Sequence, residues 1–311
     1  MTVENEAGET DRVEPLARWD LRMTLGECVT WDARPVEGAP RGRWLWTDIE
    51  TRRLYTLSGE LGAQPRSVDL PHRLASFGLT ADPYVLLAAF DYGLAWLDLR
   101  DQSVRTLAEI EADRPETRLN DGRVDREGRF WVGSMLSSFH PYAPPAGSLY
   151  CYDGDRLHTV RTGIRIPNSL AFSADGAWMY FSDSRSFTIG RAPLHGGSDM
   201  PETTSGFATL SGGLHADGSA VDADGGLWNA QWGGGVVRYA PDGARTLQLT
   251  LPTLQPTCVG LGGPDMDQLL VVCATLDGPP GQDPEADGSA LLFRTDRHAV
   301  PEPLFRVAPP L

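Results

Sequence analysis

The sequence predicts an all-β fold, a single six-bladed β-propeller with a metal site in its central pore. Three observations indicate this fold. A pattern of two short apolar strands around a small polar turn recurs six times along the chain. No stretch keeps the 3.6-residue periodicity of an amphipathic helix. The six copies spread over about 290 residues, so each has somewhat under 50, the size of one four-stranded propeller blade.

Each copy has the composition of a β-hairpin, rich in Trp, Tyr, Leu and Val and bounded by Gly, Asp and Pro. A β-sandwich pair or a large barrel would also use such hairpins, but the similarity and even spacing of the copies favour a propeller. One blade cannot bury both of its faces, so the ring has to close. We expect the strand-like segment 16–23 to pair with the last blade and close it.

The chain ends and composition limit the remaining possibilities. Residues 1–14 are acidic and polar and lack the features of a secretion signal, so we expect a flexible segment there and one domain over 15–311. The net charge of −15 disfavours nucleic acid as a partner. No apolar run reaches 18 residues, so no membrane span is expected. The four cysteines are scattered, which predicts free thiols in a reducing, cytoplasmic location. We expect a monomer or a weak dimer.

Four of the copies carry a metal-ligating residue type at the same position, five residues before the turn. The innermost strand of each blade runs along the pore, so residues at one phase of the repeat meet at one height. Two carboxylates and two amides meeting there would repel and lose hydration unless a cation were bound. The four residues are Glu27, Asn120, Asn168 and Asp217, and the matching points of the other two copies fall near Ala75 and Thr257.

An all-oxygen ligand set favours a hard divalent ion, with Ca²⁺ as first choice and Mg²⁺ or Mn²⁺ next, while Zn²⁺ and Fe²⁺ stay open. The alternative is that these residues only form turns, as Asn and Asp often do before small residues. Their shared phase favours the metal site. Four further polar residues at the turns are interpreted as turn formers only: Asp32, Asp125, Asp175 and Asp222.

Five segments, in the same order along the chain, resemble the regucalcin (senescence marker protein) and gluconolactonase family. They are LGECVTWD at 25–32, RLNDGRVDREGRFWVGSM at 118–135, IPNSLAFSADGAWMYFSDS at 166–184, ADGSAVDADGGLWNAQWGGGVVRYAPDG at 216–243 and PTCVGLGGPDMDQLLVVCAT at 256–275. The resemblance implies a six-bladed propeller with one pore metal that hydrolyses sugar lactones to aldonic acids.

By position, the resemblance also implies roles for individual residues. Glu27, Asn168 and Asp217 match the family's metal ligands, and Asp217 also matches the proposed general base. Arg118 and Asn120 match residues that contact the substrate's oxygens. The chain departs from the family pattern at several places, where the usual glycines, proline and acidic residue are replaced by Cys28, Ser169, Ala216 and the run Leu136-Ser137-Ser138.

Other residues are candidates for the rim of the pore. His140 lies in the Pro-rich stretch SSFHPYAPP, and the loop 136–147 would cover the pore mouth or else be a plain surface loop. Trp232, before a glycine turn, is placed to stack on a sugar ring. His215 shares a strand side with Asp217 by the period of two, although a structural role is preferred for it.

Three functions fit these patterns. The first is a metal-dependent sugar lactonase, in which the metal polarises the carbonyl and Asp217 assists the attacking water. The second is a related propeller esterase or phosphotriesterase. The third is a calcium-binding regulator without catalysis. Arg118 beside Asn120 favours an oxygen-rich substrate and therefore the first function. The motifs G-x-S-x-G and H-E-x-x-H are absent from the sequence.

Overall fold

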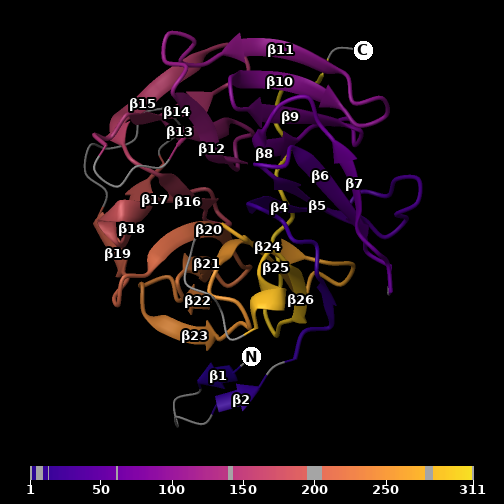
Figure 1. Cartoon of the computed structure of the whole chain (residues 1–311), viewed down its shortest axis with the longest axis vertical. Helices are drawn as coiled ribbons and strands as arrows, with labels where there is room; N and C mark the ends of the chain where they lie inside the picture. The colour runs from indigo at the N-terminus through magenta and orange to yellow at the C-terminus, as the bar shows by residue number, and fades with distance from the viewer. Residues whose placement is uncertain are drawn as a thin grey trace.

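Six antiparallel β-sheets surround a central axis in the computed structural model of the chain (Figure 1). The structure describes residues 2–4, 10–12, 14–60, 62–138, 143–194, 205–276 and 283–309. The predicted six-bladed propeller is confirmed. Within the described ranges, the helical elements are two short 3₁₀ turns, η1 (Ser184–Ser186) and η2 (Pro284–Ala286), and no helix is long and apolar enough to cross a membrane.

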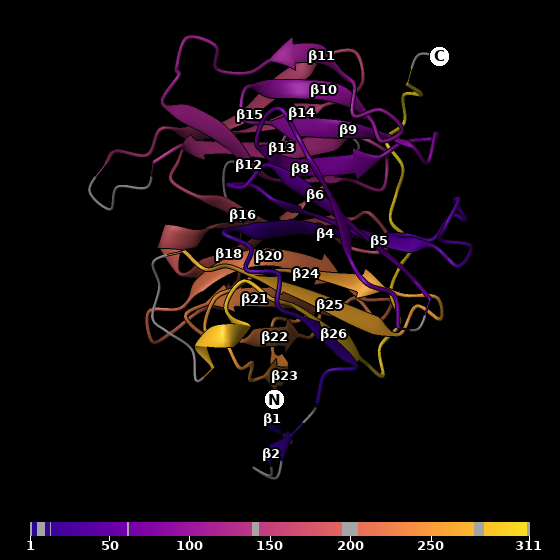
Figure 2. The same cartoon turned by 45° about the vertical axis from the view of Figure 1, so that its right-hand side comes forward.

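The blades follow one another along the chain, and the first strand of each blade lies nearest the axis (Figures 1 and 2). In chain order the blades are β4 (Gly26–Asp32), β5 (Arg43–Asp48), β6 (Arg53–Ser58), β7 (Arg66–Asp69); β8 (Leu74–Leu79), β9 (Val85–Phe90), β10 (Gly93–Asp98), β11 (Val104–Glu109); β12 (Thr117–Val124), β13 (Phe130–Leu136), β14 (Gly147–Tyr152), β15 (Leu157–Ile164); β16 (Pro167–Phe172), β17 (Trp178–Asp183), β18 (Thr188–Pro193), β19 (Ser205–Thr209); β20 (His215–Val221), β21 (Leu227–Trp232), β22 (Val236–Tyr239), β23 (Arg245–Leu249); and β24 (Pro256–Gly262), β25 (Gln268–Cys273), β26 (Ala290–Arg294).

A strand from the beginning of the chain completes the sixth blade. β3 (Ala17–Trp19) pairs antiparallel with β26, and Arg18 lies opposite Leu291. The ring therefore closes through the segment expected from the sequence, although the strand covers only three residues of 16–23. The short strands β1 (Thr2–Glu4) and β2 (Thr10–Arg12) add to the outer edge of the fifth blade beside β23.

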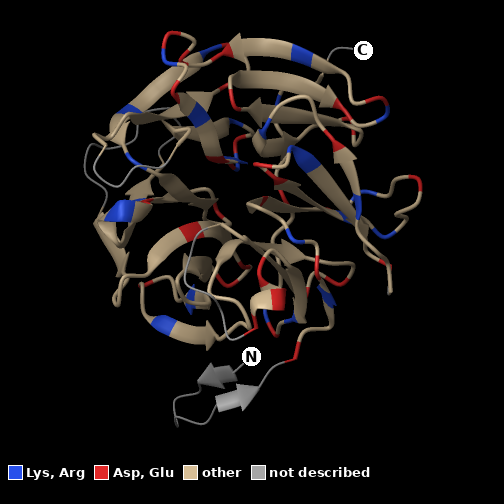
Figure 3. Cartoon of the chain, viewed as in Figure 1, with Lys and Arg blue, Asp and Glu red and all other residues tan. Residues whose placement is uncertain are grey.

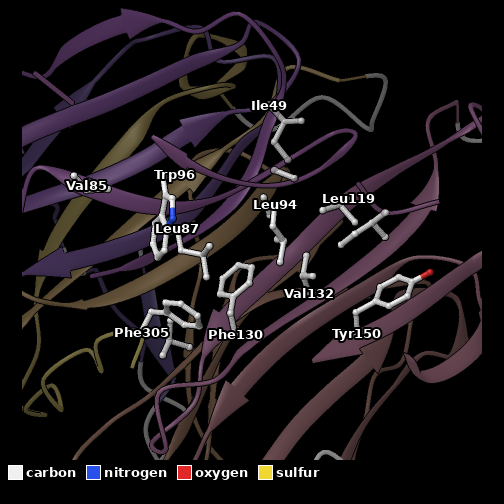
Figure 4. Close-up of a cluster of buried hydrophobic side chains, with 14 of the residues drawn as sticks. Ile49, Val85, Leu87, Leu94, Trp96, Leu119, Phe130, Val132, Tyr150 and Phe305 are labelled. Carbon is white, nitrogen blue, oxygen red and sulfur yellow. The ribbon is translucent and has the colours of Figure 1, made fainter. Parts of the chain in front are cut away.

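Large apolar side chains fill the space between neighbouring blades. Figure 4 shows one such cluster, in which Leu87 and Trp96 of the second blade face Phe130 and Val132 of the third. All four are at most 7% exposed, and burying a side chain of this size contributes about 1.5–3 kcal/mol. Because this packing locks each blade against the next, the pore that they surround has fixed walls.

The C-terminal segment 298–306 crosses one end of the pore. Arg126 Nη1 donates a hydrogen bond to the carbonyl of Pro301 (2.8 Å), and Arg123 pairs with Glu302 (3.3 Å). The amide of Phe305 donates to the carbonyl of Leu79 (2.7 Å) in the second blade. This segment covers the ends of the inner strands, so the wide cavity of the pore lies at the end where the inner strands begin.

Candidate active site

A cavity of about 620 Å³ lies at the beginning of the inner strands. It brings together six of the seven site residues predicted from the sequence. Figure 3 shows acidic and basic segments side by side at the centre of the ring. The six predicted residues are Glu27, Arg118, Asn120, Asn168, Asp217 and Trp232, and the other lining residues are Thr24, Leu25, Glu50, Met135, Ser137, Ile166, Ser184, Arg185, His215 and Leu276.

The seventh residue, His140, lies outside the described residues, as do its neighbours from 139 to 142. Its contact with substrate therefore stays a prediction. The same holds for the covering role of the loop 136–147. The described part of that loop places Ser137 on the cavity wall.

Each of the four pore residues predicted from the repeat phase lies at an irregularity of an inner strand. The pairing register shifts between Glu27 and Thr30, and again between Asn168 and Ala171. Equivalent shifts occur in β12 and β20. A β-bulge bends its strand and re-aims nearby side chains, and bulges are common next to active sites. The bulges explain why these polar residues project into the pore.

The bulges also show why glycine is usual at two positions where this chain departs from the family pattern. Cys28 and Ser169, which replace the usual glycines, have φ angles of 53° and 60°. This left-handed region costs a residue with a Cβ roughly 1–2 kcal/mol, and glycine avoids the penalty. The chain therefore keeps the bulge geometry with two residues that are strained in it. At Gly218 the reason for glycine is space, because a Cβ there would lie 2.6 Å from Cys258 Sγ.

A chain of hydrogen bonds fixes the two amide side chains of the site. Arg118 Nη1 donates to Asn120 Oδ1 (2.7 Å), and Asn120 Nδ2 donates to Asn168 Oδ1 (3.1 Å). Asn168 Nδ2 in turn donates to Ser184 Oγ (2.9 Å), whose hydroxyl donates to the carbonyl of Ala216 (2.6 Å). Because an amide oxygen has two lone pairs, Asn168 Oδ1 keeps one of them for a further partner.

Two buried carboxyl groups, Glu27 and Asp217, line the same cavity as this network. Burial raises the pKa of Glu27 well above its usual value, and the nearby charges of Asp217 and Asp121 raise it further. Burial likewise raises the pKa of Asp217, followed by the charge of Asp121. Asp217 Oδ1 is buried and has no hydrogen-bond partner among the described residues. Such an oxygen is costly to keep in the folded protein without a cation or a proton.

These residues fit one divalent cation. Two buried carboxylates that repel each other, one with an unpaired oxygen, lie beside an oriented amide oxygen. In the described ranges, no three His, Cys, Asp or Glu side chains gather as a metal cluster, so the candidate ligand set depends on the amide of Asn168. Oxygen donors of this kind suit hard ions.

The raised pKa values predict how the metal-free protein responds to pH. Below about pH 4, Glu27 is protonated in both the folded and the unfolded chain and has no effect on stability. As pH rises, the unfolded chain ionises first, because folding raises the pKa of Glu27, so the free energy of unfolding falls. In a chelating buffer, Glu27→Gln should therefore be increasingly more stable than the wild type between about pH 4 and 7.

Urea denaturation of both proteins at four pH values measures this difference. Carboxyl groups that do not interact with Glu27 contribute equally to the two proteins and cancel in the comparison. A stability difference that stays constant from pH 4 to 7 would show that folding does not raise the pKa of Glu27 in the metal-free protein.

Two charged residues of the cavity lining, Glu50 and Arg185, and the nearby carboxylate of Asp121 were not assigned to the site from the sequence. His215 was assigned a structural role in preference to a pore role. His215 Nδ1 donates to the carbonyl of Ser184 (3.0 Å), so its Nε2 is free to accept from Arg185 Nη1 at 3.5 Å. Arg185 comes from η1 and Glu50 from the turn between β5 and β6. Asp121 accepts from the amide of Leu170 (2.8 Å), and burial raises its pKa to about 6. Only His215 had a sequence signal, its spacing of two residues from Asp217.

The chain is similar to known proteins over nearly its whole length. The profile of the family described as SMP-30/gluconolactonase/LRE-like region matches residues 25–275. An L-arabinolactonase of Azospirillum brasilense is 40% identical over 90% of this chain and 91% of its own length. A 6-deoxy-6-sulfogluconolactonase of Pseudomonas putida is 35% identical over 90% of this chain and 94% of its own.

Among solved structures, regucalcin from Agrobacterium tumefaciens, described as a calcium-binding protein, superposes with a TM-score of 0.83 at 30% identity. The match covers 95% of this chain and 98% of that one. A luciferin-regenerating enzyme matches with a TM-score of 0.81 at 21% identity, a likeness of fold.

Proposed function

The chain belongs to the SMP-30/gluconolactonase/LRE-like family and is a lactone hydrolase, and we propose that it opens sugar lactones to aldonic acids in the pore cavity with one bound divalent cation. One observation carries the proposal. Two buried carboxylates, an oriented amide and a buried arginine line the same cavity, which is large enough for a monosaccharide lactone.

Glu27, Asn168 and Asp217 would hold the cation. Ca²⁺ is the first choice because the ligands are all oxygens and because the regucalcin of similar structure is described as calcium-binding. Mg²⁺, Mn²⁺, Zn²⁺ and Fe²⁺ are the alternatives. When bound, a divalent cation supplies Lewis-acid polarisation of the lactone carbonyl.

The chain's own residues would bind the lactone and move one proton. Asp217 Oδ1, which lacks a hydrogen-bond partner in the described part of the protein, would take a proton from the attacking water. The water oxygen bonds to the carbonyl carbon, the ring C–O bond breaks, and the released alkoxide takes up the proton. The product is the hydroxy acid. Arg118, held by Leu119 O and Asn120 Oδ1, would bind a substrate oxygen through a charge-assisted hydrogen bond. Trp232 would pack on the sugar ring from the fifth blade.

The test is hydrolysis by purified protein that has been stripped of metal and reloaded with each of the five ions. The panel contains γ- and δ-aldonolactones, a simple aryl ester and a phosphotriester. We expect at least one ion to support aldonolactone opening at about 10³ times the spontaneous rate or faster. Elemental analysis of untreated protein should show one metal per chain.

The same panel separates the other candidate functions. Turnover of the ester or phosphotriester but of no lactone would identify a different hydrolase. Tight Ca²⁺ binding without turnover of any substrate would contradict the proposal and favour a binding protein.

A further inference from the structure

Glu50 projects into the cavity from the turn between β5 and β6 of the first blade. Its side chain is 30% exposed and lies between two arginines. Glu50 Oε2 is 3.4 Å from Arg73 Nη1, and Glu50 Oε1 is 3.9 Å from Arg118 Nε. The metal site and the proposed proton transfer do not use this carboxylate.

The gap between Glu50 and Arg118 has the chemistry of a hydroxyl site. A separation of 3.9 Å is too long for a hydrogen bond, and the buried Arg118 Nε has no hydrogen-bond partner among the described residues. Arginine can only donate and an ionised carboxylate can only accept. An alcohol does both, so one hydroxyl group between them would accept from Arg118 Nε and donate to Glu50 Oε1.

Both sides of this gap are held in place. Arg118 Nη1 donates to the carbonyl of Leu119 (2.9 Å) and to Asn120 Oδ1 (2.7 Å), which fixes the plane of the guanidinium group. On the other side, Arg73 Nε donates to Asp91 Oδ2 (3.2 Å) and so keeps its Nη1 beside Glu50. A site whose groups are fixed before binding loses little conformational freedom when the ligand arrives.

We propose that Glu50 and Arg118 Nε bind one hydroxyl group of the substrate, which makes Glu50 a specificity-determining residue for hydroxylated lactones. The inference depends on the proposed function and adds a residue that selects hydroxylated lactones. The lactone has to carry a hydroxyl group that reaches the first blade while its carbonyl lies near Glu27 and Asp217. A lactone without hydroxyl groups leaves the buried Arg118 Nε unpaired and is rejected for that reason.

The test compares a pentono-1,4-lactone with γ-butyrolactone, which has the same ring and no hydroxyl groups. Glu50→Gln should lower kcat/KM for the pentonolactone about 10- to 100-fold, mainly through KM, because binding rather than chemistry is weakened. For γ-butyrolactone, kcat/KM should change less than about threefold.

Asp69→Asn is the matched control. Asp69 lies in the same blade and also pairs with an arginine, Arg53 (3.0 Å), but its side chain is 83% exposed and it does not line the cavity. This variant should keep the wild-type preference between the two lactones. If Glu50→Gln lowers kcat/KM equally for both lactones, or if Asp69→Asn removes the preference as well, the assignment of Glu50 is overturned.

A binding measurement separates this inference from the proposed hydrolysis. A 1,4-anhydropentitol has the hydroxylated ring without the carbonyl, so its affinity does not depend on turnover. Calorimetry should show that Glu50→Gln binds this compound at least about tenfold more weakly than the wild type does. Equal affinity would overturn the hydroxyl site even in an active lactonase. A difference in affinity in a protein that opens no lactone would support the site and contradict the hydrolase.

Discussion

Replacing Asp217 with asparagine is expected to lower kcat/KM for aldonolactone opening by about 10³-fold or more. General-base assistance is typically worth 10²- to 10⁴-fold, and the same substitution removes one of two carboxylates from the candidate cation site. Asparagine keeps the size of the side chain, and the hydrogen bond from Asn229 Nδ2 goes to the backbone carbonyl of residue 217, so the local fold should persist. Initial rates across a metal titration measure both losses.

The same variant should be more stable than the wild type when both are kept metal-free. Burial and the charge of Asp121 raise the pKa of Asp217, so an ionised carboxylate there destabilises the folded chain at neutral pH. We expect Tm in a chelating buffer to rise by a few degrees. Asp224→Asn, an exposed position of the same blade, is the control and should change neither rate nor Tm. An Asp217→Asn variant that keeps more than a tenth of the wild-type activity would contradict the proposed role of Asp217 as general base and cation ligand.

The sequence predicted those parts of the site that follow the repeat. Glu27, Asn120, Asn168 and Asp217 share one phase of the inner strands, and inner strands of a closed ring run side by side, so these residues reach one cavity. Ring closure was predictable because one blade cannot bury both of its faces and the strand-like segment 16–23 was available to pair with the last blade. The strand that closes the ring is shorter than the expected segment 16–23, since only Ala17–Trp19 pairs with β26.

The remaining site residues do not follow the repeat. Glu50 and Arg185 come from a turn and from η1, where the path of the backbone decides which way a side chain points. Asp121 directly follows Asn120, and strict alternation would place the two on opposite faces of the strand. The register shift between Leu119 and Gly122 breaks the alternation, so the charge of Asp121 acts on Glu27 and Asp217. Bulges of this kind leave no periodic signal in one sequence.

The turn aspartates of the blades have a larger role than the sequence suggested. Asp222 is fully buried, and its carboxylate accepts hydrogen bonds from Trp228 Nε1 (2.8 Å) and Arg238 Nε (2.7 Å). It also accepts from the amide of Gly226 (2.8 Å). Asp125 makes the same kind of contacts with Trp131 Nε1 and Arg129 Nε. In each of these two blades, one carboxylate thus links the turn after the inner strand to the next strands through hydrogen bonds.

Asp222→Ala should therefore lower the free energy of unfolding by about 3–5 kcal/mol, because it leaves the buried Arg238 charge without its partner. The site itself should be unaffected, since Asp222 lies at the far end of β20 from the cavity, so folded protein should keep its kcat. Urea denaturation at neutral pH measures the loss. Asp175→Ala is the matched control, because Asp175 occupies an exposed turn of the fourth blade and should cost less than about 1 kcal/mol. If the two variants lose equal stability, Asp222 is a turn former only, and the blade depends on its apolar packing rather than on this buried carboxylate.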